Sequence, residues 1–134
     1  MTLAGIEFVP DRPVATIVEW SQLAEQVGFD HVWITDHYNN RNVYVILTAL
    51  AMNTEKIKFG PGVTNPYLIH PVMTAQAMES LNELAPNRAV CGIGAGDKTT
   101  LDMITEERAK PLGAVKEAVE IIRELTTKGF VSYD

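Results

Sequence analysis

The sequence has little of several features that define specialised protein classes. It holds a single cysteine, Cys91, so we expect no disulfide within the chain and no thiol-based metal site. No stretch approaches 18 apolar residues, and residues 1–30 lack a basic segment followed by an apolar run. We therefore predict neither membrane insertion nor export, and assign the chain to the cytoplasm. The net charge of −6 argues against nucleic acid as a partner.

The composition is typical of an ordinary globular domain. Hydrophobic residues make up 46% of the chain and charged residues 21%. The sequence contains no low-complexity tract and no linker, so we predict one domain over residues 1–134. No His, Cys, Asp or Glu residues have the spacing of metal ligands, and we predict no metal site.

Four apolar runs, each followed by a helical pattern, predict the fold. The runs cover residues 5–8, 31–37, 57–63 and 89–97, and their starts lie about 26 to 32 residues apart, which is the repeat of βα units. We therefore predict an α/β fold with about four βα units, the N-terminal half of a (β/α)8 barrel.

The length of the chain does not allow a closed barrel. A complete barrel needs roughly 250 residues, so we expect this 134-residue chain to be truncated at its C-terminus, where residues 130–133 resemble the start of another strand. Because a half-barrel has two unpaired sheet edges and an apolar inner face, we expect a homo-oligomer.

Apolar residues at three- and four-residue spacing predict four helices. The four stripes are Val14, Ile17, Trp20, Ala24 and Val27; Val43, Ile46, Leu47, Leu50 and Ala51; Thr74, Ala77, Met78, Leu81 and Leu84; and Val115, Ala118, Val119, Ile122 and Leu125. Asn42 is the expected N-cap of the second helix, Pro71 and Pro111 start the third and fourth, and Gly28 and Gly129 follow the first and last. The connection 98–110 is expected to hold a short irregular helix.

Carboxylates lie where the first two strands end. Glu7 lies inside an otherwise apolar strand, so its carboxylate must be paired, solvated at the barrel mouth or partly protonated. Asp36 and His37 close the second run and precede a loop dense in hydrogen-bonding groups, residues 38–42. Barrels of this kind keep their chemistry on the loops after the strands. A structural ion pair at Glu7 and a capping role for Asp36 would explain the same residues.

The third and fourth corners are rich in glycine. Residues 60–66, Gly-Pro-Gly-Val-Thr-Asn-Pro, either let a flat ligand approach the backbone closely or form a tight barrel corner. Residues 92–97 differ from the dinucleotide-binding fingerprint, because Asp97 stands where its last glycine belongs. We therefore reject a Rossmann fold and interpret this corner as an open backbone for a phosphate or a ring, followed by a third carboxylate.

Together these corners resemble the coenzyme F420-dependent methylenetetrahydromethanopterin reductases of the bacterial luciferase-like family. The most specific segment is residues 33–44, Trp-Ile-Thr-Asp-His-Tyr-Asn-Asn-Arg-Asn-Val-Tyr, and residues 5–8, 51–54, 60–66 and 92–97 match as well. The resemblance covers essentially the whole chain, but it corresponds only to the N-terminal portion of those enzymes.

The resemblance implies a cofactor, a substrate and a set of site residues. The deazaflavin coenzyme F420 is expected at the C-terminal mouth of the barrel, exchanging a hydride with the methylene group of a folate-like pterin. The residues implied to contact it are Asp36, His37, Gly62, Val63, Asn65, Ala95, Gly96 and Asp97. Gly62 and Val63 are expected to be joined by a cis peptide bond that backs the ring.

The resemblance also implies that Glu7 protonates the pterin nitrogen as the methylene bridge opens. Opening produces an iminium cation, which Glu7, Asp36 and Asp97 could stabilise while one of them delivers the proton. Glu7 is the carboxylate set deepest in an apolar strand, so we expect burial to raise its pKa.

Two other interpretations stay open. The chain could be a non-catalytic half-barrel that binds a ligand or assembles with another half. It could also belong to an FMN-dependent luciferase-like monooxygenase, which the segment 33–44 disfavours.

Overall fold

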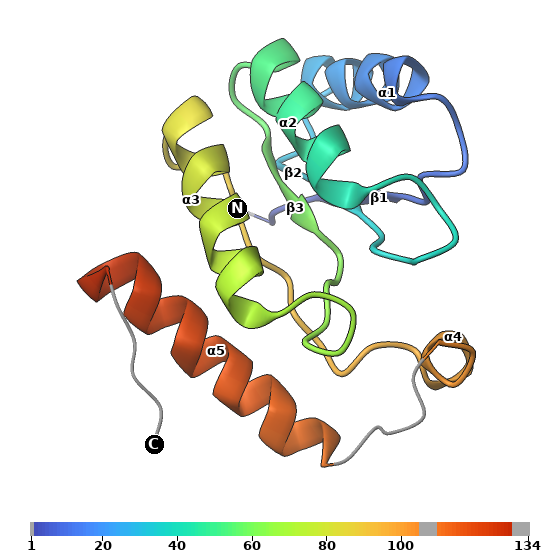
Figure 1. Cartoon of the computed structure of the whole chain (residues 1–134). Helices are drawn as coiled ribbons and strands as arrows, with labels where there is room; N and C mark the ends of the chain where they lie inside the picture. The colour runs from blue at the N-terminus through green and yellow to red at the C-terminus, as the bar shows by residue number, and fades with distance from the viewer. Residues whose placement is uncertain (1, 105–109, 130–134) are drawn as a thin grey trace.

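The computed structural model describes residues 2–104 and 110–129 and shows an α/β arrangement in which strands alternate with helices (Figure 1). The elements are, in chain order, β1 Gly5–Phe8, α1 Val14–Gln26, β2 His31–Ile34, α2 Val43–Asn53, β3 Lys58–Pro61, α3 Pro71–Leu84, α4 Lys98–Leu101 and α5 Pro111–Lys128. The four long helices and the short helix at residues 98–101 confirm the helical predictions. The strand expected at residues 130–133 lies outside the described residues.

The strands form a parallel sheet in the order β1-β2-β3, with β2 at its centre. In the register of the sheet Glu7 lies beside Trp33, and Trp33 lies beside Gly60. Parallel neighbours require a crossover helix between them, and α1 and α2 are those crossovers. The sheet is therefore the beginning of the predicted barrel.

The fourth predicted strand is present only as two isolated parallel bridges to the third. Phe59 pairs with Ala89 and Thr64 with Ile93, so residues 60–63 on one side face residues 90–92 on the other. The extra residue on the β3 side is a bulge, which interrupts a regular ladder. The prediction of a fourth continuous strand is therefore wrong, although this segment lies where that strand would be.

Helix ends follow the local chemistry of the sequence. The Asn42 side chain accepts hydrogen bonds from the backbone N–H groups of Tyr44 and Val45 at 3.0 and 3.2 Å, which caps the start of α2 as predicted. Pro71 and Pro111 occupy the first turns of α3 and α5. Gly129 ends α5 in the left-handed conformation at φ 76°, confirming its predicted place.

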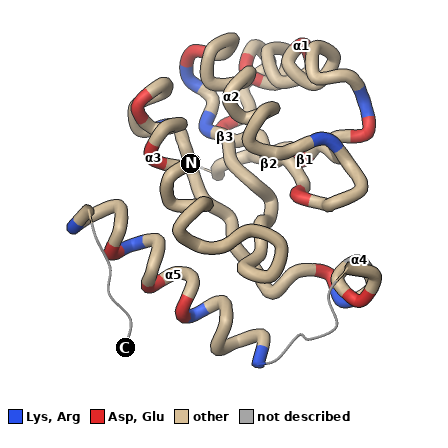
Figure 2. Tube along the Cα trace, in the orientation of Figure 1, with Lys and Arg blue, Asp and Glu red and all other residues tan. Residues whose placement is uncertain are grey.

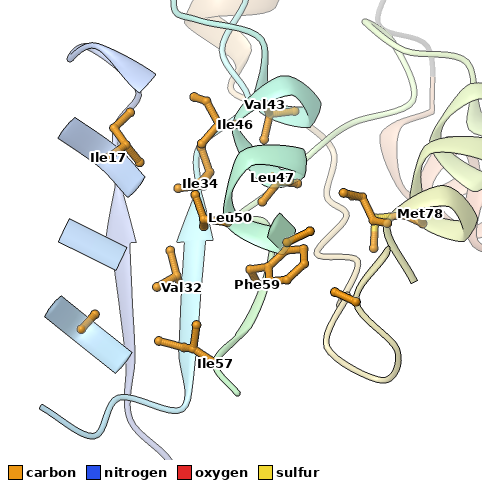
Figure 3. Packing of buried hydrophobic residues seen from close by; sticks show 14 residues of the cluster. Ile17, Val32, Ile34, Val43, Ile46, Leu47, Leu50, Ile57, Phe59 and Met78 are labelled. Carbon is orange, nitrogen blue, oxygen red and sulfur yellow. The ribbon is translucent and has the colours of Figure 1, made fainter. Parts of the chain in front are cut away.

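The hydrophobic core lies between the sheet and helices α1, α2 and α3 (Figure 3). Val32 and Ile34 of β2 and Phe59 of β3 point from the sheet toward Ile17 of α1 and Leu47 of α2, all of them almost fully buried. Every residue of the apolar stripe predicted for α2 is buried. Full burial of such a side chain stabilises the fold by about 1.5–3 kcal/mol. The packing of these side chains therefore holds β2 and β3, and the loops that follow them, in place.

Helix α1 buries a narrower stripe than the sequence predicts. Ile17 and Ala24 are buried, but Trp20 is 40% exposed and Val27 is 65% exposed. Trp20 turns toward the free edge of β1, where its ring lies 5.6 Å from the ring of Phe8. The stripe prediction is wrong at Trp20 and Val27 because the described sheet covers only one side of α1.

An apolar groove of about 190 Å³ follows from this arrangement. It runs between α1 and the free edge of β1, and its lining residues are Ile6, Phe8, Trp20, Leu23, Ala24, Val27 and Phe29.

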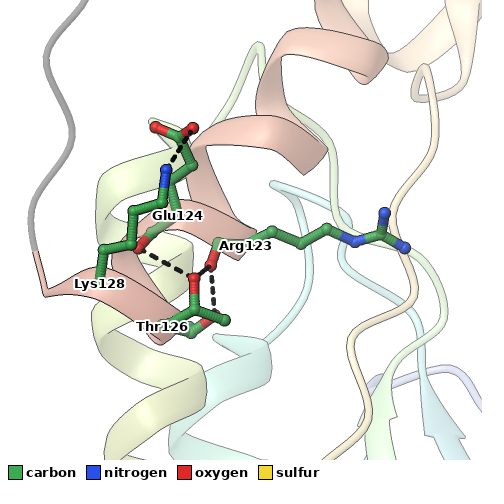
Figure 4. Close-up of polar contacts among 5 residues, drawn as sticks. Arg123, Glu124, Thr126 and Lys128 are labelled. Carbon is green, nitrogen blue, oxygen red and sulfur yellow. Dashed lines mark hydrogen bonds and ion pairs between the residues drawn. The ribbon is translucent and has the colours of Figure 1, made fainter.

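Helices α2 and α5 differ in surface character (Figure 2). Helix α2 carries no charged residue, and its outer face exposes Val45 and Met52. Helix α5 carries acidic and basic residues along its length and packs against α3. Its last turns are held by Lys128, which lies 3.2 Å from Glu124, and by the Thr126 hydroxyl, which donates to the carbonyl of Arg123 at 3.2 Å (Figure 4). The polar helix thus lies at the periphery and the apolar helix beside the sheet.

At the N-terminal ends of the strands, polar contacts join α1 to the α2–β3 connection. The Glu25 carboxylate accepts hydrogen bonds from the backbone N–H groups of Glu55, Lys56 and Ile57 at 2.6 to 3.2 Å. Arg88 donates to the carbonyl of Ala51 at 2.8 Å and lies over the ring of Phe59. These contacts tie the ends of three elements together.

The ionisation of Glu25 reflects this environment. Partial burial acts to raise the pKa of Glu25, but the three backbone donors and the nearby charge of Arg88 outweigh it and lower the pKa below its ordinary value. A lowered carboxylate pKa contributes stability at neutral pH that is lost as the pH falls through that pKa.

We therefore predict that Glu25→Gln reduces the free energy of unfolding by about 1–2 kcal/mol at pH 7. The difference from the wild type should shrink in acid, because both proteins then carry a neutral group at position 25. Urea denaturation followed by circular dichroism at pH 7 and at pH 3 measures both quantities. Glu19→Gln, on the exposed face of α1, is the matched control. An equal loss of stability in both variants would refute a stabilising role for the hydrogen bonds between Glu25 and the α2–β3 connection.

Candidate functional site

A cavity of about 520 Å³ lies at the C-terminal ends of the strands. It brings together all nine residues predicted from the strand ends: Glu7, Asp36, His37, Gly62, Val63, Asn65, Ala95, Gly96 and Asp97. Its remaining lining residues are Val9, Thr35, Leu68 and Leu101. Positions up to 90 residues apart in the sequence therefore line one cavity, because parallel strands end at one edge of the sheet.

A second cavity, of about 600 Å³, lies between α3 and α5. It is lined by helix residues such as Glu79, Glu83 and Ile122 and by Ala89 and Cys91 at the start of the fourth segment. None of the predicted site residues lies in it. The smaller cavity is therefore the candidate functional site, since chemistry in this architecture belongs to the carboxyl ends of the strands.

Asp36 is the half-buried carboxylate of the site. It follows β2, and its Oδ2 accepts a hydrogen bond from the Thr64 hydroxyl at 2.8 Å. Burial raises the pKa of Asp36, while the Thr64 hydrogen bond and the positive charge of protonated His37 act in the opposite direction. The pKa of this carboxylate therefore lies above its ordinary value.

Glu7 differs from what the sequence predicted. Its side chain lines the cavity but is exposed, so the prediction that Glu7 is the most deeply buried carboxylate of the site is wrong. The physical reason is that β1 is an edge strand and its cavity side is not covered by any of the residues described. Asp97 and His37 are exposed at the mouth of the same cavity.

The third corner has the backbone geometry that the resemblance implies. The peptide bond between Gly62 and Val63 is cis, which confirms the prediction. The Gly62 N–H donates to the carbonyl of Ile34 at 2.8 Å, and a Cβ at Gly62 would lie 2.7 Å from the Cβ of Trp33. Only glycine fits at this close approach, and Val63 turns its side chain to the cavity.

Asn65 has a structural contact that limits its part in ligand binding. It is almost fully buried, and its Oδ1 accepts hydrogen bonds from the backbone N–H groups of Tyr67 and Leu68, both at 3.1 Å. The oxygen thus caps the turn after the third corner.

The fourth corner wraps around Leu101 and Asn65. Gly96 has φ +71°, and a Cβ there would lie 2.6 Å from Leu101 and 3.2 Å from Asn65. A side chain at this position would be both strained and crowded. The backbone of residues 95–97 therefore lies directly against the cavity, and α4 begins at the next residue.

Sequence reasoning missed two threonines at the site. Thr64 is fully buried and holds the Asp36 carboxylate. Thr35 lines the cavity, is 6% exposed, and has a buried hydroxyl with no hydrogen-bond partner in the structure. The alternation of strand residues could have found Thr35, because it shares the inner side of β2 with Trp33. No comparable signal marks Thr64.

The described residues lack two further features, a metal-binding cluster and a membrane-spanning helix. Within residues 2–104 and 110–129, no group of three or more His, Cys, Asp and Glu side chains is placed to hold a metal ion. In the same part of the chain, no helix is both long and apolar enough to cross a membrane.

Comparison with known proteins gives close relatives. The chain is 57% identical over 130 residues to 5,10-methylenetetrahydromethanopterin reductase of Archaeoglobus fulgidus, covering 97% of this chain and 39% of that protein. It is 53% identical over 119 residues to the reductase of the same name from Methanolobus tindarius, covering 89% of this chain and 36% of the relative. The chain thus spans about two fifths of the length of the curated relatives it matches.

A solved structure and a family pattern agree with these relatives. The coenzyme F420-dependent tetrahydromethanopterin reductase from Methanopyrus kandleri superposes with a TM-score of 0.91 at 37% identity, over 98% of this chain and 42% of that one. The pattern that defines the family described as luciferase-like monooxygenase matches residues 3–134. The fold, the site at the strand ends and these matches show that the chain belongs to the luciferase-like monooxygenase family.

Proposed function

We propose that this chain forms the cofactor-binding part of a coenzyme F420-dependent reductase that acts on 5,10-methylenetetrahydromethanopterin. The observation that carries the proposal is the cavity at the strand ends, where the residues implied by the resemblance converge. The names of the relatives from Archaeoglobus fulgidus and Methanolobus tindarius supply the substrate. The structural relative from Methanopyrus kandleri supplies the cofactor.

The cavity fits a flat, partly polar ring. Val63 and Leu68 provide apolar surface, and the backbone at Gly62 and Gly96 leaves no side chain in the way. The Thr35 hydroxyl is buried without a partner, which is the condition of a polar group that a ligand or an ordered water satisfies. A volume of about 520 Å³ lies within the roughly 300–1,000 Å³ of small-molecule sites.

The carboxylates of this chain have two roles in the proposed reaction, stabilisation of a cationic substrate and proton transfer. A bound deazaflavin supplies the hydride. Opening of the methylene bridge makes the pterin a cation, which the carboxylates of Asp36 and Asp97 stabilise. Glu7, across the cavity mouth, delivers the proton to the pterin nitrogen as the bridge opens. Because Glu7 is exposed, we propose that the bound reactants themselves exclude water from it.

The alternatives make different predictions for binding. We predict that the chain binds coenzyme F420 saturably at micromolar concentration and binds FMN more weakly. Asp36→Asn should weaken F420 binding about tenfold, because a charged hydrogen-bond acceptor is lost. Fluorescence titration measures both ligands, with Asp30→Asn at the opposite end of β2 as the matched control.

Tighter binding of FMN would favour the monooxygenase interpretation. If the chain bound neither coenzyme F420 nor FMN, the proposal that it forms a cofactor-binding site would be refuted.

Turnover is tested in a chimera that joins residues 1–134 to the remaining part of the Archaeoglobus fulgidus reductase. Glu7→Gln should lower kcat by about two to four orders of magnitude, the contribution of a general acid, with little change in F420 affinity. Glu19→Gln is the control for the same change at a distant position. Near-normal turnover of the Glu7 variant would move the proton-donor role to Asp36 or Asp97.

We also propose that the chain self-associates through its apolar groove and the free edge of β1. An unpaired parallel edge beside exposed Trp20, Leu23 and Val27 favours pairing with a second copy. Sedimentation velocity at micromolar concentration should show a species larger than one chain, and Leu23→Glu should shift it toward the monomer. A stable wild-type monomer would contradict this proposal.

A further inference from the structure

Thr64 lies where four parts of the fold meet. It is fully buried after the end of β3, and its backbone bridges to the fourth segment: its N–H donates to the carbonyl of Gly92 at 3.0 Å, and its carbonyl accepts from Gly94 at 2.9 Å. Both backbone groups are thus used in pairing. The position of its side chain is therefore set by the sheet and not by a mobile loop.

The hydroxyl of Thr64 connects the site to two more hydroxyl groups. It donates to Asp36 Oδ2 at 2.8 Å, and its only proton is used in that bond. The half-buried Tyr44 hydroxyl lies near it, so that the Thr64 hydroxyl acts to lower the pKa of Tyr44. Tyr44 donates to the buried Thr74 hydroxyl at 3.4 Å. Asp36, Thr64, Tyr44 and Thr74 form a hydroxyl chain that joins β2, β3, α2 and α3.

This hydroxyl chain has a polarity set by the charge at its end. An ionised Asp36 can only accept, so Thr64 must donate to it. Tyr44 is held by the capped first turn of α2, where Asn42 accepts from the backbone N–H of Tyr44 itself at 3.0 Å. The orientation of the carboxylate is therefore determined by buried groups that do not touch the cavity.

The arrangement uses only one oxygen of the carboxylate. Thr64 contacts Oδ2, while Asp36 lines the cavity. Burial raises the pKa of Asp36 and the Thr64 hydrogen bond opposes that rise, so loss of the hydroxyl favours the protonated form. A protonated Asp36 would donate a hydrogen bond, whereas the ionised carboxylate only accepts, so the cavity would offer a ligand a donor in place of an acceptor.

We propose that Thr64, fixed by the pairing of its backbone with Gly92 and Gly94, is a positioning residue that holds the Asp36 carboxylate with its second oxygen turned toward the bound ring. This inference rests on the proposed function, because it assigns the ring as the partner of that oxygen. Under this proposal neither Thr64 nor Tyr44 contacts the reacting atoms of the cofactor or the substrate.

The first test follows the carboxyl carbon of Asp36 in the 134-residue chain by 13C NMR as a function of pH. Thr64→Val should raise the midpoint of the Asp36 titration, since a bond to the charged form is lost, and Thr64→Ser should restore it. Thr48→Val is the matched control, because the Thr48 hydroxyl donates only to the carbonyl of Tyr44 at 2.8 Å. The other titratable groups that share the cavity are Glu7, His37 and Asp97, and Tyr44 of the hydroxyl chain has Cys91 as a further titratable neighbour.

The second test measures F420 binding by the same variants. Thr64→Val should raise the dissociation constant roughly 10- to 100-fold, and Tyr44→Phe by a smaller factor, while Thr64→Ser stays close to the wild type. If Thr64→Val does not fold by circular dichroism, Thr64→Ala removes the same hydroxyl with a smaller side chain and takes its place.

The outcomes separate this inference from the proposed function. An unchanged Asp36 titration in Thr64→Val, or in Thr64→Ala where the valine variant does not fold, overturns the positioning role whatever the chain binds. F420 binding by the wild type that is unaffected by loss of either hydroxyl overturns the link to the ring and leaves the proposed function intact. A wild-type chain that does not bind F420 refutes the proposed function, and the NMR titration still decides whether Thr64 controls Asp36.

Discussion

Parallel pairing of β2 with both of its neighbours is the constraint on which the rest of the structure depends. Because the strands run in one direction, the connecting helices return along one face, and the loops that follow the strands meet at one edge. The register also decides which side chains face which way. Val32 and Ile34 enter the core under α1 and α2, while Trp33 and Thr35 face the opposite side. A shift of one residue would exchange the two sets.

The two ends of the strands have different physical roles. At the N-terminal ends the Glu25 carboxylate accepts hydrogen bonds from three backbone N–H groups and lies near Arg88, so its negative charge is compensated by groups of the protein. At the C-terminal ends of the strands Asp36 accepts a hydrogen bond from the neutral Thr64 hydroxyl, and burial raises the pKa of Asp36. A carboxylate that is oriented but only partly compensated is suited to interact with a ligand. Stability and binding are thus assigned to opposite ends of the same strands.

The fold and most of the cavity lining could be predicted because their signals are local. Apolar periodicity and the capping side chain of Asn42 define helices from neighbouring residues alone. The strand ends indicate where the site lies once parallel pairing is assumed, and the family resemblance supplies the individual lining residues. The exposure of Glu7 and Trp20 could not be predicted this way. It depends on which neighbours cover an edge strand, and that is a property of the assembled sheet.

Other features depend on contacts between distant segments. The bulge opposite residues 90–92 arises from a mismatch between two strands, and a pattern within either one does not reveal it. The role of Thr64 depends on Asp36, 28 residues earlier, and on Tyr44 in a helix. A threonine between Val63 and Asn65, in a segment rich in glycine and proline, looks like any other turn residue until these partners are placed around it.

The central claim is that a flat cofactor ring occupies the cavity at the strand ends, and ligand-induced changes in amide chemical shifts test it most directly. In a 1H–15N titration of the chain with coenzyme F420, the account predicts shifts concentrated at residues 35–37, 62–65 and 95–97. Amides near Glu25 and Arg88, at the opposite edge of the sheet, should stay in place. Shifts centred instead on the cavity between α3 and α5, around Glu79 and Ile122, would contradict it.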